Sequence, residues 1–100
     1  MTRARLPNRR AGHNSVIECD GLTAVCTVNL WHDGTPGEIF LDVGKPGAQI
    51  DLIARDAACL WSIARQYGAP ADVLAHSLAR LEDGSPATIL GVAADLAVSS

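Results

Sequence analysis

Apolar and polar positions alternate on both sides of Asp20-Gly21, as they do in strands that bury one face of a sheet. A type I′ turn requires a positive φ angle at both central positions, and Asp-Gly meets this requirement readily. Such a turn places Cys19 opposite Leu22. A third alternating stretch follows the turn at residues 32–37. The predicted strands span residues 14–19, 22–31 and 38–43.

The second hairpin is predicted to pair Leu30 with Ile39 and Val28 with Leu41. All four side chains then join the apolar face of the first hairpin. Two independent hairpins that agree on one core side support an antiparallel meander. The predicted core face carries Ile17, Cys19, Leu22, Ala24, Cys26, Val28, Leu30, Ile39, Leu41 and Val43.

The opposite face of this sheet holds more large apolar side chains than a solvated sheet face usually does. Val25, Trp31 and Phe40 are predicted to lie there. Exposed apolar patches mark interfaces, although single surface hydrophobic residues are common. We therefore predict a homodimer that buries Val25, Trp31 and Phe40.

After Gly47 the apolar positions recur every three or four residues, which predicts helices. The predicted helices span residues 48–67, 70–82 and 86–97. In the first helix the periodic positions form a stripe of the kind that faces a core: Ile50, Ile53, Ala57, Leu60, Ala64 and Tyr67. Strands followed by helices predict an α+β domain, with the helices on one face of the antiparallel sheet.

Charge divides the chain into a basic arm, residues 1–12, and a single acidic domain, residues 13–100. The formal net charge is −3, and the first ten residues carry four arginines, so the remainder carries −7. The arm has no apolar periodicity and is predicted to be flexible. Its arginines are candidates for contact with nucleic acid or an acidic partner; in the alternative interpretation the arm lies against its own domain. These arginines are Arg3, Arg5, Arg9 and Arg10.

The cysteines indicate a reducing, cytoplasmic setting. Cys19, Cys26 and Cys59 are odd in number and form no C-x-x-C pair, which argues against disulfides and a structural zinc site. The helical pattern predicts that Cys59 is buried. No apolar run reaches the length of a membrane span, and the basic start leads into no secretory signal.

The stretch "GKPG", residues 44–47, offers Lys45 as a candidate binding residue. It lacks the phosphate-loop pattern, because proline stands where serine or threonine is required. The structural interpretation is a glycine-hinged corner between a strand and a helix, where Lys45 points to solvent or pairs with Glu38 or Asp42. The alternative is anion binding by Lys45 beside the N-terminus of the following helix.

No catalytic residues are predicted. Asp72 and His76 have the i, i+4 spacing of a surface pair on a helix, and no nucleophile elbow accompanies them.

The stretches "GEIFLDVGKPG" and "IARDAACLWSIARQYGAP" resemble the TSCPD domain, which is found at the C-terminus of adenosylcobalamin-dependent (class II) ribonucleotide reductases and as small stand-alone proteins. The family pattern has an acid, an alternating apolar strand, Gly-Lys-x-Gly, a helix rich in alanine and leucine, and a Gln-Tyr/His-Gly end. The matching residues are Glu38, Ile39, Phe40, Val43, Gly44, Lys45, Gly47, Gln66, Tyr67 and Gly68. The Thr-Ser-Cys-Pro-Asp string that names the domain is not present.

The resemblance implies a TSCPD-like domain that serves as a non-catalytic accessory module linked to ribonucleotide reductase and deoxyribonucleotide synthesis. The reductase barrel and its adenosylcobalamin site belong to the larger enzyme, so no cofactor is expected on these 100 residues. The alternative is a small protein of phage or mobile-element type. Such a protein would bind nucleic acid or a ribonucleoprotein through the basic arm, in one version as an inhibitor.

Overall fold

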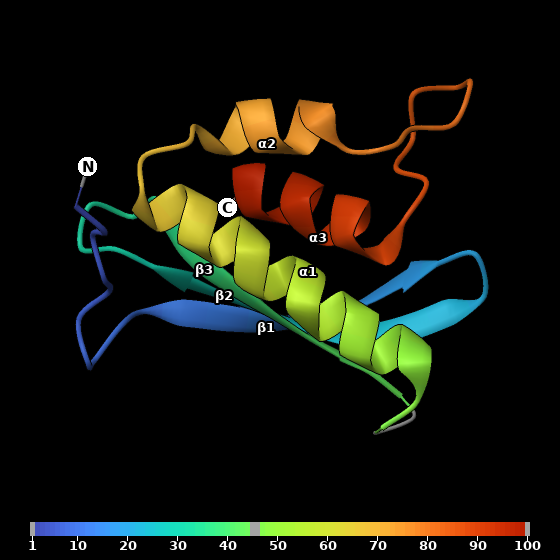
Figure 1. Ribbon diagram of the computed structural model, residues 1–100, viewed down its shortest axis with the longest axis horizontal. Helices are drawn as coiled ribbons and strands as arrows, with labels where there is room; N and C mark the ends of the chain where they lie inside the picture. The colour runs from blue at the N-terminus through green and yellow to red at the C-terminus, as the bar shows by residue number, and fades with distance from the viewer. Residues whose placement is uncertain (1, 45–46, 100) are drawn as a thin grey trace.

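A computed structural model describes residues 2–44 and 47–99 of the chain (Figure 1). One antiparallel sheet contains the strands β1 (Gly12–Cys19), β2 (Leu22–Leu30) and β3 (Pro36–Val43) in that spatial order. The helices α1 (Gln49–Gln66), α2 (Ala71–Ser77) and α3 (Ile89–Val98) follow. All three lie on one side of the sheet; α1 and α3 contact the strands, and α2 packs on α3. The predicted α+β class is confirmed.

The first hairpin has the predicted register. Cys19 pairs with Leu22, and the two turn residues, Asp20 and Gly21, have φ angles of 50° and 77°. These are the positive values that a type I′ turn requires.

The register of the second hairpin was predicted wrongly by two residues. Val28 pairs with Ile39, not with Leu41, because β3 begins already at Pro36. A tight turn closes this hairpin: the Trp31 N–H donates to the Thr35 carbonyl over 2.9 Å. A register irregularity at the end of β2 accommodates the turn. Because side chains alternate with period two, an even shift leaves the residues that pair before this irregularity on their predicted faces.

The second helix ends earlier than predicted. Helix α2 stops at Ser77, and Leu78 is extended with a ψ angle of 156°. The following residues form a small hairpin-like loop, in which Arg80 pairs with Pro86 and Leu81 N donates to Ser85 O over 2.9 Å. The apolar periodicity beyond Ser77 therefore belongs to a loop.

The core lies between the sheet and the two helices that contact it. From the sheet it takes Ile17, Ala24, Cys26, Val28, Ile39, Leu41 and Val43. From the helices it takes Ala54, Ala58, Trp61, Ala75, Ile89, Ala93, Ala94 and Ala97. No helix among the described residues is long and apolar enough to cross a membrane.

Helix α1 faces the sheet with a different side than predicted. The predicted stripe, which we call the outer stripe of α1, contains the exposed side chains of Ile50, Ile53, Leu60 and Tyr67 and the half-buried Ala57 and Ala64. Leu60 is 68% exposed and Ile53 is 53% exposed. The side that contacts the sheet carries Asp51, Ala54, Ala58, Trp61, Ser62 and Gln66. The prediction of a buried stripe was therefore wrong, and Cys59 is exposed for the same reason.

Candidate functional site

The inner side of α1 is polar because it covers the outer edge of β3. Opposite residues of antiparallel strands alternate between pairs that exchange backbone hydrogen bonds and pairs that do not. Every second residue of the edge strand β3 therefore directs its backbone groups away from β2. Two of these residues, Ile39 and Val43, bond to side chains of α1. Unpaired backbone groups at a buried edge are costly, so these contacts explain why polar residues face the sheet.

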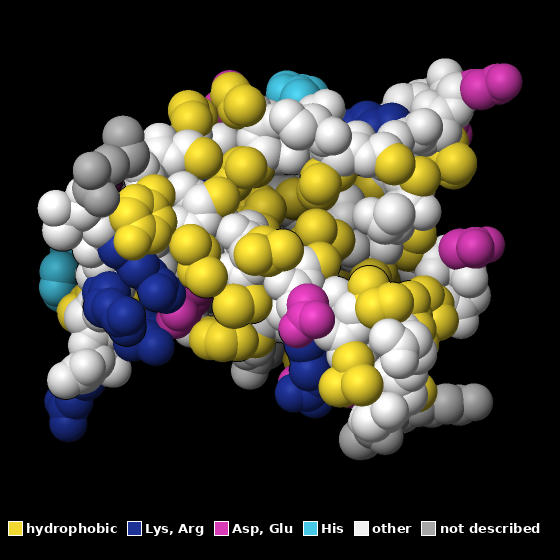
Figure 2. All heavy atoms as spheres, viewed as in Figure 1, with side chains coloured by type: hydrophobic (Ala, Val, Ile, Leu, Met, Phe, Trp, Pro, Cys, Tyr) yellow, Lys and Arg dark blue, Asp and Glu magenta, His cyan; other side chains and the backbone are white. Residues whose placement is uncertain are grey.

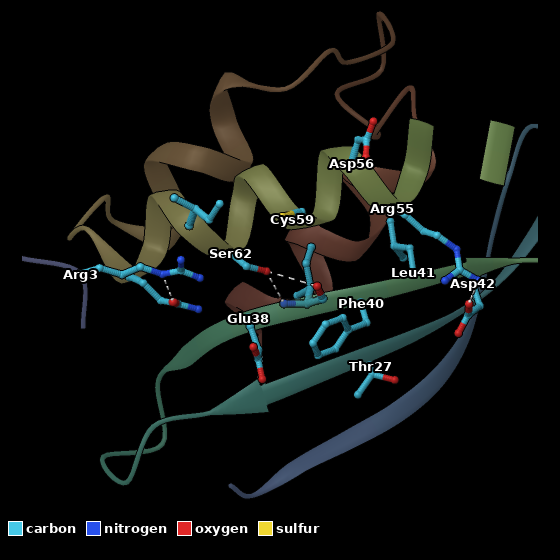
Figure 3. A pocket seen from close by; sticks show the side chains of 13 residues that line it. Arg3, Thr27, Glu38, Phe40, Leu41, Asp42, Arg55, Asp56, Cys59 and Ser62 are labelled. Carbon is cyan, nitrogen blue, oxygen red and sulfur yellow. Dashed lines mark hydrogen bonds and ion pairs between the residues drawn. The ribbon is translucent and has the colours of Figure 1, made fainter. Parts of the chain in front are cut away.

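Ser62 and Asp51 make these contacts, and Figure 3 shows Ser62 beside β3. The Ser62 hydroxyl accepts a hydrogen bond from the Ile39 N–H over 3.0 Å. Its own proton lies within reach of the carbonyl oxygens of Ile39, at 3.2 Å, and Ala58, at 2.8 Å. The Asp51 carboxylate accepts from the Val43 N–H over 3.0 Å.

Asp51 is buried as an ionised group. Burial by itself would raise the pKa of Asp51, but hydrogen bonds from the Val43 N–H and from Arg55 outweigh it and hold the pKa below its ordinary value. Arg55 also pairs with Asp42, and its Nη2 lies 2.5 Å from the Asp42 carboxylate.

The C-terminal turn of α1 continues this pattern toward the start of β3. Gln66 Nε2 donates to Gly37 O over 3.2 Å, and Arg65 Nε donates to Pro36 O over 2.7 Å. The Arg65 guanidinium also lies over the ring of Trp31, 5.1 Å from its centroid. One side of α1 thus contacts the sheet and its edge, and the large side chains of the outer stripe, Ile53, Leu60 and Tyr67, are left exposed.

The outer stripe of α1 adjoins an apolar groove. Figure 2 shows hydrophobic side chains spread over the face formed by α1 and α2. The groove has a volume of about 430 Å³ and lies between the N-terminal half of α1, the first hairpin turn and residues 78–90. Its lining includes Leu22, Ile53, Leu78 and Ile89, and among the described residues that line it Asp20 alone carries a charge.

The N-terminal arm lies against its own domain. The Arg3 Nε donates to Gln66 Oε1 over 2.7 Å, and the Ala4 N–H donates to the Gln66 carbonyl over 2.7 Å. Further along, Leu6 lies so close to Gly37 that a Cβ added to Gly37 would lie 2.7 Å from its Cδ1. Residues 2–11 form neither helix nor strand, yet they run along the start of β3.

Glu38 joins the arm to the sheet. It forms an ion pair with Arg10 and accepts a hydrogen bond from Asn29 Nδ2 over 2.9 Å. The predicted candidate Lys45 lies outside the described residues. The two acids considered as its partners, Glu38 and Asp42, form ion pairs with Arg10 and Arg55.

The residues predicted for a homodimer interface are placed in two regions. Val25 and Phe40 are exposed on the open face of the sheet, together with Val16, which is 70% exposed. Trp31 lies beyond the end of β2, where its ring packs against Arg65.

The cysteines and acidic residues form no metal centre in the described part of the chain, since no group of three His, Cys, Asp or Glu residues lies close enough to hold an ion. Cys26 is buried, and burial raises the pKa of its thiol to about 11. It is therefore protonated and unreactive near neutral pH.

The fold and its surfaces define a small α+β domain with one covered and one open sheet face. The chain is similar to short segments of vitamin B12-dependent ribonucleotide reductases. It is 35% identical over 74 residues to the reductase of Rhodopirellula baltica, and 33% identical over 86 residues to that of Bradyrhizobium diazoefficiens. These alignments cover 74% and 84% of this chain but 7% of each reductase. The reductase of Agrobacterium fabrum is 35% identical over 68 residues, which is 68% of this chain and 5% of that protein.

The chain therefore spans less than a tenth of the length of the curated relatives that it matches. No family model matches the chain, and no solved structure matches it. The expected similarity to a ribonucleotide reductase segment is confirmed, and the assignment to the TSCPD family stays a prediction.

Proposed function

We propose that this chain is a non-catalytic interaction domain of the TSCPD type that acts with a vitamin B12-dependent ribonucleotide reductase in deoxyribonucleotide synthesis. The observation that carries the proposal is the outer stripe of α1, whose large side chains Ile53, Leu60 and Tyr67 are exposed although the helix packs on the sheet. The similarity to short reductase segments supports the choice of partner.

The outer stripe has the properties of a helix face that binds a partner protein. Residues spaced by three, four and seven positions form one continuous apolar surface on a helix. Burying apolar surface contributes about 25 cal/mol per Å² of accessible area, so a partner with a complementary groove would gain from covering Leu60 and Ile53. The polar inner side cannot turn outward, because Asp51 and Ser62 are bonded to β3.

Cobalamin is proposed to bind the remainder of those longer proteins. The name of these relatives states that they depend on vitamin B12, and this chain matches 5–7% of each of them.

The test is binding of the tagged chain to a purified vitamin B12-dependent ribonucleotide reductase from the same source. Leu60→Glu places a charge in the outer stripe and is expected to abolish co-purification while the circular dichroism spectrum stays unchanged. Leu81→Glu is the matched control, because it makes the same substitution at a residue that is 56% exposed and lies in the loop after α2, outside the outer stripe and the open sheet face. Failure of the parent chain to bind, or equal binding by parent and Leu60→Glu, would refute the proposal.

A homodimer through the open sheet face is proposed as the state of the free chain. Val25, Phe40 and Val16 are the exposed apolar side chains that support it. Light scattering at high micromolar concentration is expected to give the mass of two chains, and Val16→Glu is expected to reduce it to one. The free cysteines support a cytoplasmic location.

Nucleic-acid binding through the arm remains the alternative proposal. Its support is reduced because Arg3 and Arg10, two of the four arm arginines, contact the domain itself. A gel shift in rising salt, with and without residues 1–12, tests it, since phosphate contacts lose affinity steeply with salt.

A further inference from the structure

A small cleft between the arm and the sheet has an excess of positive charge. Arg3, Arg5 and Arg10 line it together with Glu38 and Gln66, and its volume is about 220 Å³. Glu38 is the one acid among the described residues that line it, and Arg10 already matches its charge. Two guanidinium groups therefore share the cleft with no carboxylate to balance them, and charges of one sign lining a concave surface concentrate the field there.

The same end of the molecule carries the unmatched basic charge of the described chain. Figure 2 shows basic side chains gathered where the arm meets the C-terminus of α1. The arginines outside this region, Arg55 and Arg80, are both engaged with carboxylates. An anion approaching the molecule is therefore attracted to the arm cleft.

The arginines of the cleft are held before any ligand arrives. Arg3 is fixed through its Nε by Gln66, which is 4% exposed and is itself held by the Gly37 carbonyl. Arg10 is fixed through its Nε by Glu38, and its Nη1 donates to Pro7 O over 2.7 Å. A guanidinium has five N–H donors, so both retain donors for a ligand. Groups ordered in advance lose less entropy when they bind.

The cleft opens into the larger groove beside β3. The two share Arg3, Glu38 and Gln66, and the larger one has a volume of about 650 Å³. Its lining includes Ile63 and the ring of Phe40, and Phe40 is seen in Figure 3. Pockets for small organic ligands have volumes of about 300–1,000 Å³ and combine apolar walls with a few polar groups.

We propose that the arm cleft binds the diphosphate group of a small phosphorylated molecule, and that the organic part of this molecule lies in the groove beside β3. Planar guanidinium groups bind phosphate oxygens through paired hydrogen bonds, and two unmatched positive charges suit a group with at least two negative charges. A nucleoside diphosphate has this chemistry. The site shares no residue with the outer stripe of α1, so it stands or falls independently of the reductase partner; it shares Phe40 with the proposed homodimer face.

The experiment is isothermal titration of the full chain at an ionic strength of about 0.15 M, where the Debye length is about 8 Å, with inorganic pyrophosphate, ADP and adenosine as probes. Pyrophosphate and ADP are expected to bind, ADP more tightly, and adenosine is expected to give no heat. Arg5→Gln is the main variant, because Arg5 lines the cleft and makes no hydrogen bond or ion pair with residues 2–44 or 47–99. Loss of one charged hydrogen-bond donor should weaken binding about tenfold.

Arg9→Gln is the matched control, since it removes the same charge from the same arm at an exposed residue that does not line the cleft. It is expected to change the affinity less than about twofold, as a surface charge outside the contact does. Equal weakening by both variants would indicate diffuse attraction to the arm and overturn the proposal. Absence of binding by pyrophosphate and ADP at millimolar concentration would also overturn it. Binding of pyrophosphate with no gain from the adenosine portion would limit the site to the arm cleft and refute the role of the groove.

Discussion

Helices α1 and α3 cover the same side of one sheet, but α1 buries polar side chains there beside its apolar ones and α3 does not. The buried residues of α3 are apolar or small: Ile89, Gly91, Ala93, Ala94 and Ala97. The buried residues of α1 include Asp51, Ser62 and Gln66. Helix α3 packs against side chains of all three strands, whereas α1 reaches the exposed backbone edge of β3 with its polar groups.

This difference shows that the rule of a buried apolar stripe holds for a helix over side chains and fails for a helix over a strand edge. At a strand edge the groups to be satisfied are backbone N–H and C=O, so the helix must present hydrogen-bonding side chains. The apolar residues of α1 are then displaced outward, where they are available for a partner.

The largest expected effect comes from truncating the two helices at comparable apolar positions. Ile89→Ala on α3 is expected to lower the free energy of unfolding by about 2–5 kcal/mol, because Ile89 is 6% exposed and its loss leaves a cavity. Leu60→Ala on α1 is expected to change it by less than about 0.5 kcal/mol. Urea denaturation of both variants measures the contrast. A loss of similar size for Leu60→Ala would mean that the outer stripe is not exposed in solution.

The next effect concerns the polar contact between α1 and β3. Ser62→Ala removes the acceptor of the buried Ile39 N–H and is expected to cost about 1–3 kcal/mol. Ser77→Ala is a close control, because the exposed Ser77 hydroxyl bonds to Val73 O four residues earlier, as Ser62 bonds to Ala58 O. Chemical denaturation should show little change for Ser77→Ala. Equal losses would assign the effect of Ser62→Ala to the helix alone.

The smallest effect is a pH dependence on the α3 side. Hydrogen bonds from Arg80 hold the pKa of Asp95 below its ordinary value. The folded state thus binds the proton more weakly than the unfolded state. The contribution to stability is present above the unfolded pKa of about 3.9 and is lost as the pH falls through the lower folded value.

Asp95→Asn is expected to lower stability at neutral pH by less than Ser62→Ala does, because solvent screens this half-exposed pair. Asp95→Asn should also lose less stability than the parent chain as the pH falls below the ordinary aspartate pKa. Thermal melts between neutral pH and pH values below the ordinary aspartate pKa measure both effects, with Glu82→Gln as an exposed control of the same charge change. An unchanged acid profile in Asp95→Asn would contradict the role assigned to this pair.

The parts of the fold that depend on residues close together in the sequence could be predicted. Asp20-Gly21 determined the first turn and its register, because the turn needs only the positive φ angles of these two residues. The strand faces were also predictable, since alternation survives a register shift of two. The end of α2 could not be predicted. Leu78 and Leu81 continue the apolar spacing of the helix, but they lie in the loop in which Arg80 pairs with Pro86.

The orientation of α1 and the arm cleft could not be predicted from one sequence, because both depend on contacts between distant residues. Ser62 meets Ile39 across 23 positions, and Arg3 meets Gln66 across 63. One signal was present in the sequence: Asp51, Ser62 and Gln66 lie on the side of the helix opposite the apolar stripe. A prediction that allowed for an edge strand beside the helix would have assigned that side to the sheet.

Because α1 covers the edge of β3, it also restricts where a strand from another chain can be added to this sheet. In the described chain β3 is blocked at Ile39 and Val43, so β1 is the edge left to accept another strand. Head-to-tail addition would require a free edge on both sides of each copy, and such addition is what produces open-ended fibres. Two copies that paired through β1 about a twofold axis would use both free edges at once. Strand addition through β1 by itself should therefore stop at two chains.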